Sequence, residues 1–397
     1  MKAPSLHPRV RLVCEALVTA AGVALLIWAW RADRHWFELH SIRDFCAYDP
    51  GQLGRIAMWR WAGGIVGVLL LVLIRPWIGR WAGRRSARDL AGLCGRIGLA
   101  VVLALVMCEL VLRRSPYDPP SVLHREYEAI PQPDPRYGWS PVPSQVTELT
   151  VGDTHPRFVI DAGGYRVRSL DDAVDPSRPT VLVAGESIAS GFAIDYGETF
   201  GAMVADALGV QVANVGVQAY AMDMAYLRLH DVLPRFEHPL ATVTTVVPTA
   251  LDRNSYRERP HVLFEPSGGF HLEPRRDGTW LGRSQLVSVF DRIIGLHSDE
   301  ALQRARAAIV ATRRDSDARG VPAIFVLINW PNCLPDETGA PSIERTVFDG
   351  LDVIHVRATL PPETWDPVTW HPRGSGNRVI ADVVLEALRA AHVDRAR

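Results

Sequence analysis

Apolar residues are distributed very differently in the first and last parts of this chain. Before about Pro116 long apolar runs dominate, and the segments 65–74 (IVGVLLLVLI) and 97–107 (IGLAVVLALVM) have no polar face. A helix of a globular protein shows such a face, whereas a helix that crosses a bilayer is apolar over about 20 residues. The pattern therefore predicts a membrane region at residues 1–115 with three transmembrane helices. They are expected at Val10–Trp30, Met58–Trp77 and Gly95–Leu112.

Arginines indicate the direction in which these helices cross. The loop after the second span carries six arginines within residues 75–96, whereas the four arginines of the loop before it are diluted by acidic residues. Loops rich in positive charge stay in the cytoplasm. We therefore expect a multi-pass protein of the inner (cell) membrane, with everything after about Arg114 periplasmic or extracellular. The first apolar run is long and lacks a small-residue cleavage site before its tryptophans, which favours a retained span over a cleaved signal peptide.

After the membrane region the pattern becomes that of a soluble domain. Residues 116–179 are rich in proline and predict a linker followed by a short β-rich lead-in at Glu148–Val151 and Phe158–Ile160. Over residues 180–397 short apolar runs alternate with helical stretches, which predicts an α/β domain with a parallel sheet covered on both faces. Strands are expected at Thr180–Ala184, Val210–Val215, Ala241–Val247, Ala323–Leu327 and Val353–Val356. Helices are expected at Phe200–Leu208, Met222–Leu233, Glu300–Arg319 and Asn377–Ala391.

Charge and composition exclude several kinds of chemistry. The formal net charge of -1 offers no basic surface for nucleic acid. Lys2 is the only lysine, so a Ser-Lys dyad, a Schiff base and a phosphate-binding P-loop all lack their lysine. The five cysteines are scattered and show no zinc or redox spacing, and we expect neither a metal nor a cofactor. Cys46 and Cys333 are the two cysteines that an oxidising compartment could pair.

Three short elements carry candidate chemistry. The first predicted strand of the domain ends in Gly185-Glu186-Ser187, which places a serine at the mouth of the sheet beside a helix N-terminus. The next ends in Asn214-Val215-Gly216, where glycine lets a backbone N–H approach an oxyanion. Near the C-terminus Asp366 and His371 precede a last amphipathic helix, as suits a base and its orienting carboxylate. Taken singly, a serine at that place is more commonly a helix cap, the Asn-Val-Gly segment fits an ordinary strand-to-helix turn, and a lone histidine is more often a surface or core residue.

Taken together and in order, these elements resemble the SGNH (GDSL) serine hydrolases, over roughly Asp134 to Ala391. The resemblance rests on Asp134-Pro-Arg-Tyr-Gly-Trp139, Gly164-Tyr-Arg, Gly185-Glu-Ser187 through Thr199-Phe200, Asn214-Val-Gly216, Leu251-Asp-Arg-Asn254 and His371-Pro. It implies a flavodoxin-like SGNH-hydrolase domain, with Ser187 as the nucleophile, His371 as the base and Asp366 as the acid. The backbone N–H groups of Ser187 and Gly216 would then be oxyanion donors.

The chain departs from the family pattern at three positions. Glu186 stands where the nucleophile block usually has aspartate, and Thr249 occupies the place of the asparagine that completes the oxyanion hole. The acid usually precedes the histidine by two or three residues, whereas Asp366 precedes His371 by five. A threonine hydroxyl is shorter than an amide and accepts as readily as it donates, so we expect slow hydrolysis from an oxyanion hole of Ser187, Gly216 and Thr249.

The resemblance implies a membrane-anchored serine esterase or deacylase. Its location favours an acylated glycan or lipid outside the cytoplasm as the substrate, with the lipid bilayer as its other partner. One alternative is an O-acyltransferase of a polysaccharide pathway, which would need a membrane partner because three spans are too few for a donor channel. The other is a catalytically degenerate SGNH domain that binds glycan. The missing asparagine favours that domain, and the retained serine and histidine oppose it.

Overall fold

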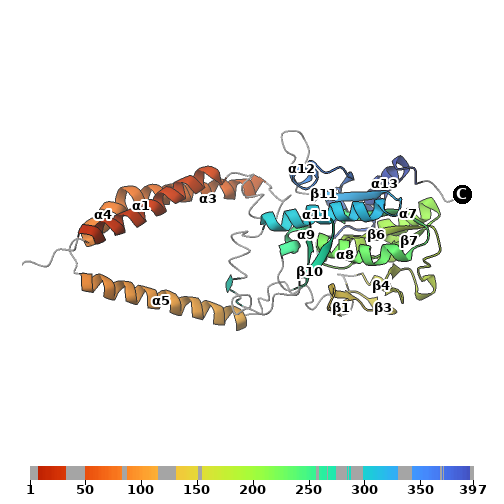
Figure 1. Ribbon diagram of the computed structural model, residues 1–397, viewed down its shortest axis with the longest axis horizontal. Coiled ribbons are helices and arrows are strands. Elements are labelled where there is room, and N and C mark those ends of the chain that lie inside the picture. Colours follow the sequence, from red (N-terminus) through yellow and green to blue (C-terminus); the bar gives the residue numbers. More distant parts are fainter. Residues whose placement is uncertain are drawn as a thin grey trace, which may run out of the picture. The chain divides into compact units, whose positions relative to one another are not determined.

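The structure is a computed structural model. It describes residues 8–32, 50–82, 87–114, 131–150, 154–255, 259–265, 267–273, 284, 286–287, 298–329, 342–366, 369 and 371–393. Both Cys46 and Cys333 lie outside these ranges, so their pairing stays untested. The chain divides into two compact units, of which the first contains the N-terminal helices and the second the α/β domain (Figure 1).

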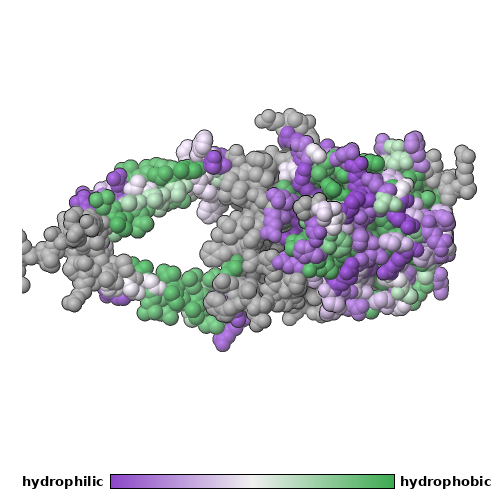
Figure 2. Space-filling view, in the orientation of Figure 1, coloured by the Kyte–Doolittle hydropathy of each residue, from purple (hydrophilic) through white to green (hydrophobic). Residues whose placement is uncertain are grey.

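The first unit consists of long apolar helices. They are α1 (Pro8–Arg31), α3 (Pro50–Leu69), the π-helical turn η2 (Leu70–Ile74), α4 (Arg75–Ala82) and α5 (Ala87–Arg114). Figure 2 shows extensive apolar surface on them, in green. Within these helices Arg11–Arg31, Ala57–Trp81 and Gly95–Arg114 are long and apolar enough to cross a membrane. The three predicted spans are therefore confirmed in length and composition.

Small residues bring α1 and α3 close together. A Cβ atom on Gly67 would lie 3.0 Å from the carbonyl oxygen of Gly22, and one on Gly22 would lie 2.8 Å from Leu71 Cγ. Helices in a bilayer associate through such close backbone approach, because lipid supplies no hydrophobic driving force between them.

The α/β domain is built on an eight-stranded sheet with the order β12-β11-β8-β6-β7-β5-β4-β3. Its parallel strands are β6 (Thr180–Ala184), β7 (Gln211–Asn214), β8 (Pro239–Val246), β11 (Ala323–Asn329) and β12 (Ile354–Thr359). Numbered along the chain, they have the 2-1-3-4-5 order of flavodoxin-like sheets. Three antiparallel strands extend this sheet beyond β7: β5 (Arg166–Val167), β4 (Arg157–Ile160) and β3 (Gln145–Glu148).

Helices cover both faces of the parallel strands (Figure 1). On one face lie α7 (Phe200–Leu208) and α13 (Gly374–Ala390), and on the other α8 (Met222–Val232), α11 (Ser298–Asp317) and α12 (Ser342–Phe348). Successive side chains of a strand point to opposite faces. In β6, Val181 and Val183 accordingly pack with α7 and α13, while Leu182 packs with Leu229 of α8. The predicted α/β fold with helices on both faces is confirmed.

Two features differ from the sequence-based expectation. The expected lead-in strand Phe158–Ile160 lies in β4, whereas Glu148–Val151 overlaps β3 only at Glu148. Both β3 and β4 continue the main sheet, and β4 buries Phe158, Val159 and Ile160 against the domain. The described residues also form two hairpins outside the main sheet, β1 (Pro131–Asp134) with β2 (Gly138–Pro141) and β9 (His261–Phe264) with β10 (Phe270–Glu273). Short helices α6 (Ser187–Ser190) and α9 (Pro248–Asp252) follow the carboxyl ends of β6 and β8.

Candidate active site

The turn between β6 and α6 brings Ser187 to the carboxyl edge of the sheet. Gly185 has φ +143, a conformation that side chains other than glycine rarely adopt, and a Cβ atom there would collide with Thr245 Oγ1 of β8. Ser187 is the first residue of α6 and is 6% exposed. Glycine thus allows the chain to turn tightly against β8 and to present Ser187 at the end of its strand.

His371 lies directly beside this serine, although 184 residues separate them. Its Nε2 atom is 2.8 Å from Ser187 Oγ, and its Nδ1 atom is 2.7 Å from the carbonyl oxygen of Thr369. A carbonyl oxygen only accepts hydrogen bonds, so Nδ1 carries the hydrogen and the neutral ring leaves Nε2 free to accept. This is the tautomer in which a histidine removes the proton of a serine hydroxyl.

The surroundings of His371 keep it available as a base. Burial lowers the pKa of His371, while the Glu186 carboxylate and the hydrogen bond to Thr369 act in the opposite direction. The Phe192 ring packs against the imidazole with a centroid distance of 4.9 Å. Because the net pKa shift is downward, the ring is neutral near pH 7, as a general base must be.

Asp366 shapes the histidine loop from within. Its Oδ1 atom accepts hydrogen bonds from Thr369 N at 2.9 Å and Thr369 Oγ1 at 3.2 Å, and its own backbone N–H donates to the His371 carbonyl at 2.8 Å. Arg373 Nη2 lies 3.5 Å from its Oδ2 atom. The resemblance implied this carboxylate as the partner of His371, but the structure puts the Thr369 carbonyl on Nδ1. The five-residue spacing produces a turn that closes on Asp366 and presents that carbonyl.

Gly216 packs the turn after β7 against the nucleophile helix. A Cβ atom on Gly216 would lie 2.7 Å from Ser190 N, and the Gly216 N–H donates to Asn214 Oδ1 at 3.0 Å. Asn214 in turn donates through Nδ2 to the Ala189 carbonyl at 2.7 Å. Thus the N–H that the resemblance assigns to the oxyanion already has an acceptor.

The two other predicted oxyanion groups lie at the same edge of the sheet. The Ser187 N–H belongs to the first turn of α6, where an amide has no acceptor within its helix. Thr249 lies in α9 after β8, and its side chain is outside the part of the chain that the structure describes. Among the described groups, the Ser187 N–H is therefore a predicted donor without an acceptor inside its own helix.

Glu186 contacts the nucleophile from a second side. Its Oε2 atom accepts hydrogen bonds from Ser187 Oγ and from Ile188 N, both at 2.8 Å, and Oε1 accepts from Thr245 Oγ1 at 3.3 Å. The side chain caps α6 and is 4% exposed. In the sequence Glu186 stands out only as a departure from the family pattern, and the available signal for its contact is a carboxylate directly before Ser187.

Asn377 ties the histidine loop to the rest of the domain. Its Oδ1 atom accepts from Phe200 N at 3.1 Å, at the start of α7, and its Nδ2 atom donates to the Pro372 carbonyl at 3.1 Å. The residue is 1% exposed. The sequence signal for this role was an asparagine in the first turn of the last predicted helix. A buried amide at such a place must find hydrogen-bond partners in neighbouring loops.

The Asp134–Trp139 motif braces the turn that follows β7. Trp139 Nε1 donates to the Gln218 carbonyl at 2.9 Å, and the Tyr220 hydroxyl donates to the Trp139 carbonyl at 2.7 Å. The two aromatic rings meet edge to face with centroids 5.7 Å apart. This early motif therefore acts on the site through the loop that carries Gly216, and not by direct chemistry.

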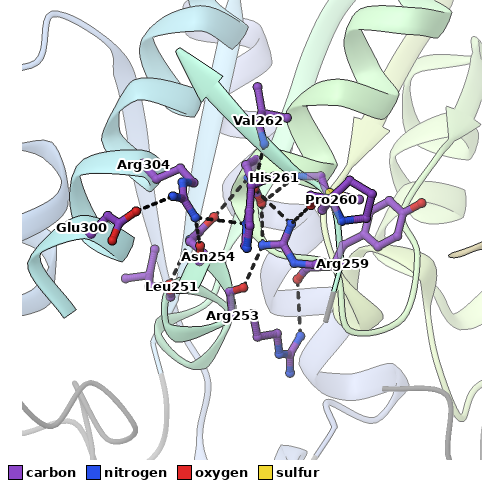
Figure 3. Close-up of polar contacts among 12 residues, drawn as sticks. Leu251, Arg253, Asn254, Arg259, Pro260, His261, Val262, Glu300 and Arg304 are labelled. Atoms are coloured by element: carbon purple, nitrogen blue, oxygen red, sulfur yellow. Dashed lines mark hydrogen bonds and ion pairs between the residues drawn. The ribbon is translucent and has the colours of Figure 1, made fainter. Parts of the chain in front are cut away.

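A largely buried polar cluster joins the segment that follows α9 to β9 and α11 (Figure 3). We call it the Asp223 cluster; it comprises Asp223, Asn254, Arg259, His261, Glu300 and Arg304. Arg259 donates to both carboxylate oxygens of Asp223, at 3.0 and 2.8 Å, and also to the Arg253 carbonyl at 2.7 Å. Asp223 lies in the first turn of α8, and its backbone N–H donates to Asn254 Oδ1 at 3.2 Å, so the cluster fastens the segment after α9 to that helix.

In the part of the chain that the structure describes, no group of three or more His, Cys, Asp or Glu side chains could hold a metal ion. The arrangement instead consists of a hydroxyl, a neutral imidazole held by a carbonyl, and a carboxylate. Such groups perform nucleophilic attack on acyl carbons.

Comparison with known proteins yields structural similarity only. No family model matches the chain, and no curated protein matches it. Among solved structures, a lipolytic protein of the G-D-S-L family from Desulfitobacterium hafniense matches with 13% identity and a TM-score of 0.33, over 52% of this chain and 98% of that one. AlinE4, an SGNH-hydrolase family esterase, matches with 16% identity and a TM-score of 0.30, over 55% and 98%. A carbohydrate esterase matches with 12% identity and a TM-score of 0.34, over 62% and 84%.

The α/β domain is similar to solved GDSL and SGNH esterases. Because these TM-scores are low, both the fold and the chemistry follow from the strands and side chains of this chain alone.

Proposed function

We propose that this chain is a membrane-anchored serine esterase or deacylase that acts on ester groups of a glycan or lipid outside the cytoplasm. The observation that carries the proposal is the contact of 2.8 Å between Ser187 Oγ and His371 Nε2, with Nδ1 bonded to a carbonyl. That geometry supplies a nucleophile and a base in the correct tautomer.

The reaction follows from these groups. Ser187 Oγ attacks the ester carbonyl carbon as its proton passes to His371 Nε2, and the C=O electron pair moves onto the carbonyl oxygen. We assign the Ser187 N–H to stabilise that developing negative charge, because a donor that is already in place stabilises it most. His371 then returns the proton to the leaving alkoxide, and the C–O bond breaks to give an acyl-enzyme. Water, deprotonated by the same imidazole, then attacks the acyl carbon. The bond between that carbon and Ser187 Oγ breaks, His371 returns the proton to Oγ, and the acid leaves.

Ser187→Ala tests this function in the full-length chain, purified in detergent. We expect wild-type protein to be labelled by a fluorophosphonate probe and to hydrolyse a short-chain p-nitrophenyl ester, and the alanine variant to lose both activities. Losing one member of a catalytic unit costs nearly as much as losing several. Ser177→Ala is the matched control, because Ser177 is an exposed serine whose hydroxyl bonds Asp175 in a remote turn. Wild-type turnover in the Ser187 variant would refute the assignment.

The location in the proposal is supported by the three apolar helices and by the arginines that flank them. Reporter fusions should give a cytoplasmic signal within residues 80–96 and a non-cytoplasmic signal after Arg114. A cytoplasmic reporter at the C-terminus would overturn the external placement of the domain, and with it the class of substrate.

A glycan-binding domain without turnover is the second candidate, and one observation favours it. The Gly216 N–H is bonded to Asn214, so a donor that the resemblance assigns to the oxyanion is occupied. Failure of the probe to label Ser187, combined with retention of an acylated polysaccharide by the wild-type protein, would decide for binding.

A further inference from the structure

We propose that Glu186 is a further catalytic residue, whose carboxylate balances the charge of His371 from the serine side. The inference rests on the proposed esterase function. It gives Glu186 a catalytic role in addition to its role as the cap of α6. In the usual triad a carboxylate on Nδ1 stabilises the imidazolium that forms during attack. Here that position holds the neutral carbonyl of Thr369.

Geometry places Glu186 where it can take this role. Its Oε2 atom and His371 Nε2 each lie 2.8 Å from Ser187 Oγ. The carboxylate therefore lies within the range of about 4–6 Å over which an opposite charge favours a charged imidazole. Burial to 4% exposure removes the water that would otherwise screen the interaction. Two further donors, Ile188 N and Thr245 Oγ1, hold the carboxylate in this position.

The serine hydroxyl has one hydrogen and two acceptors. When that hydrogen passes to Nε2, the imidazole gains a positive charge, the ester oxygen gains a negative one, and Glu186 keeps its charge throughout. Glu186 neither gains nor loses a proton in this step, so the atoms and charges balance with Ser187, His371 and the ester alone. Its contribution is electrostatic, and it is largest in the transition state, where the imidazolium exists.

Other charged groups act on the same imidazole and must be separated from Glu186 in any test. Arg253, from the segment after α9, opposes the protonation of His371, and Asp366, from the histidine loop itself, favours it. Among the charged groups that favour protonation, Glu186 has the larger effect on the pKa of His371. A pH profile of variants at Glu186 therefore reports mainly on this carboxylate.

Glu186→Gln is the decisive variant, measured in the full-length chain. The amide keeps a carbonyl oxygen for the Ile188 N–H, so the helix cap survives while the charge is lost. We expect kcat/KM on a short-chain ester to fall about 10- to 100-fold, a part of the 10²–10⁴-fold that acid–base catalysis contributes. We also expect the acidic limb of the pH profile to move to lower pH, because the imidazolium loses its counter-charge. Glu186→Asp should restore part of the rate, and Glu237→Gln, at an exposed glutamate, should change neither quantity.

A second variant tests the same charge effect independently if Glu186→Gln folds poorly. Thr245→Val preserves the shape beside Gly185 but removes the hydroxyl donor to Glu186 Oε1. Without that donor, less of the negative charge on Glu186 is offset, so the carboxylate favours the His371 imidazolium more strongly. The acidic limb of the pH profile should then move to higher pH, opposite to the glutamine variant. A purely structural role would lower the unfolding temperature and leave both limbs where they are in wild type, which would overturn the proposal. If the fluorophosphonate probe fails to label Ser187 in the wild-type protein, the proposed esterase function itself is wrong. If the probe labels wild type and Glu186→Gln at equal rates, the esterase function stands and only the proposed role of Glu186 is wrong.

Discussion

The ion pair between Asp223 and Arg259 supports the sharpest prediction about stability. Asp223 is 0% exposed and Arg259 1% exposed, and the guanidinium donates to both carboxylate oxygens. In Asp223→Asn the side chain keeps its shape, but a buried guanidinium loses its counter-charge. Breaking a buried pair in this way costs about 3–5 kcal/mol, which lowers the unfolding midpoint of a domain of this size by about 6–20 °C.

The same pair predicts sensitivity to acid. Burial by itself raises the pKa of Asp223, but the charge of Arg259 and the hydrogen bonds from His261 and Arg259 outweigh it and hold the pKa well below its usual range. A carboxyl whose pKa is depressed by folding stabilises the protein above its unfolded pKa of about 3.9, and that stabilisation is lost as the pH falls toward the folded pKa. The wild-type midpoint should therefore drop steeply below about pH 4, and that of Asp223→Asn less steeply.

Thermal unfolding of the full-length chain in detergent, followed by scanning fluorimetry between pH 3 and pH 8, provides the assay. Glu300→Gln is the matched control, because Glu300 pairs with Arg304 of the same cluster through a half-exposed side chain, and exposed pairs contribute about 0–1 kcal/mol. Replacing both partners in Asp223→Leu/Arg259→Met should recover much of the loss. A midpoint of Asp223→Asn equal to that of Glu300→Gln would refute the reasoning.

Two further predictions concern the site itself. Because burial lowers the pKa of His371 and the base must be neutral, log kcat/KM should rise with pH through a midpoint below about 6.5 and then level off; a midpoint above that value would contradict the burial of the ring. Gly216→Ala should cost about 1–3 kcal/mol of stability and reduce turnover, because its Cβ atom would lie 2.7 Å from Ser190 N and displace the nucleophile helix. An unchanged unfolding midpoint and kcat would show that α6 moves aside without consequence.

Local signals explain which elements of the fold could be predicted from the sequence. The bounds of β6 and α7 match the prediction because each ends at a strong marker: β6 at Gly185, and α7 between the Thr199 cap and Gly209, which adopts φ +68. The assignment of β3 and β4 to a separate lead-in missed their place in the main sheet. Pairing partners are set by tertiary contacts, and a short apolar run such as Phe158–Ile160 does not specify its neighbour.

The site shows the same division. Ser187 and His371 could be found because both stand at turns with recognisable neighbours, and the structure brings them within hydrogen-bonding distance. The hydrogen-bond partner of His371 Nδ1 could not be predicted, because it is a main-chain carbonyl. Every residue has such a group, so no residue type in the sequence indicates it. The role of Asp366 depends on how the turn between it and His371 folds, and Asp366 stabilises that turn by accepting hydrogen bonds from Thr369.

Holding the base on the last loop of the domain has a consequence for biogenesis. His371 and α13 follow every strand of the sheet along the chain, and Asn377 fastens that loop to the start of α7, far earlier in the sequence. A ribosome releases the nucleophile turn long before the imidazole, and domains fold as their segments emerge. A nascent or truncated domain that lacks the His371 loop and α13 therefore has Ser187 without its imidazole partner, so the proposed esterase activity would require α13 to be folded.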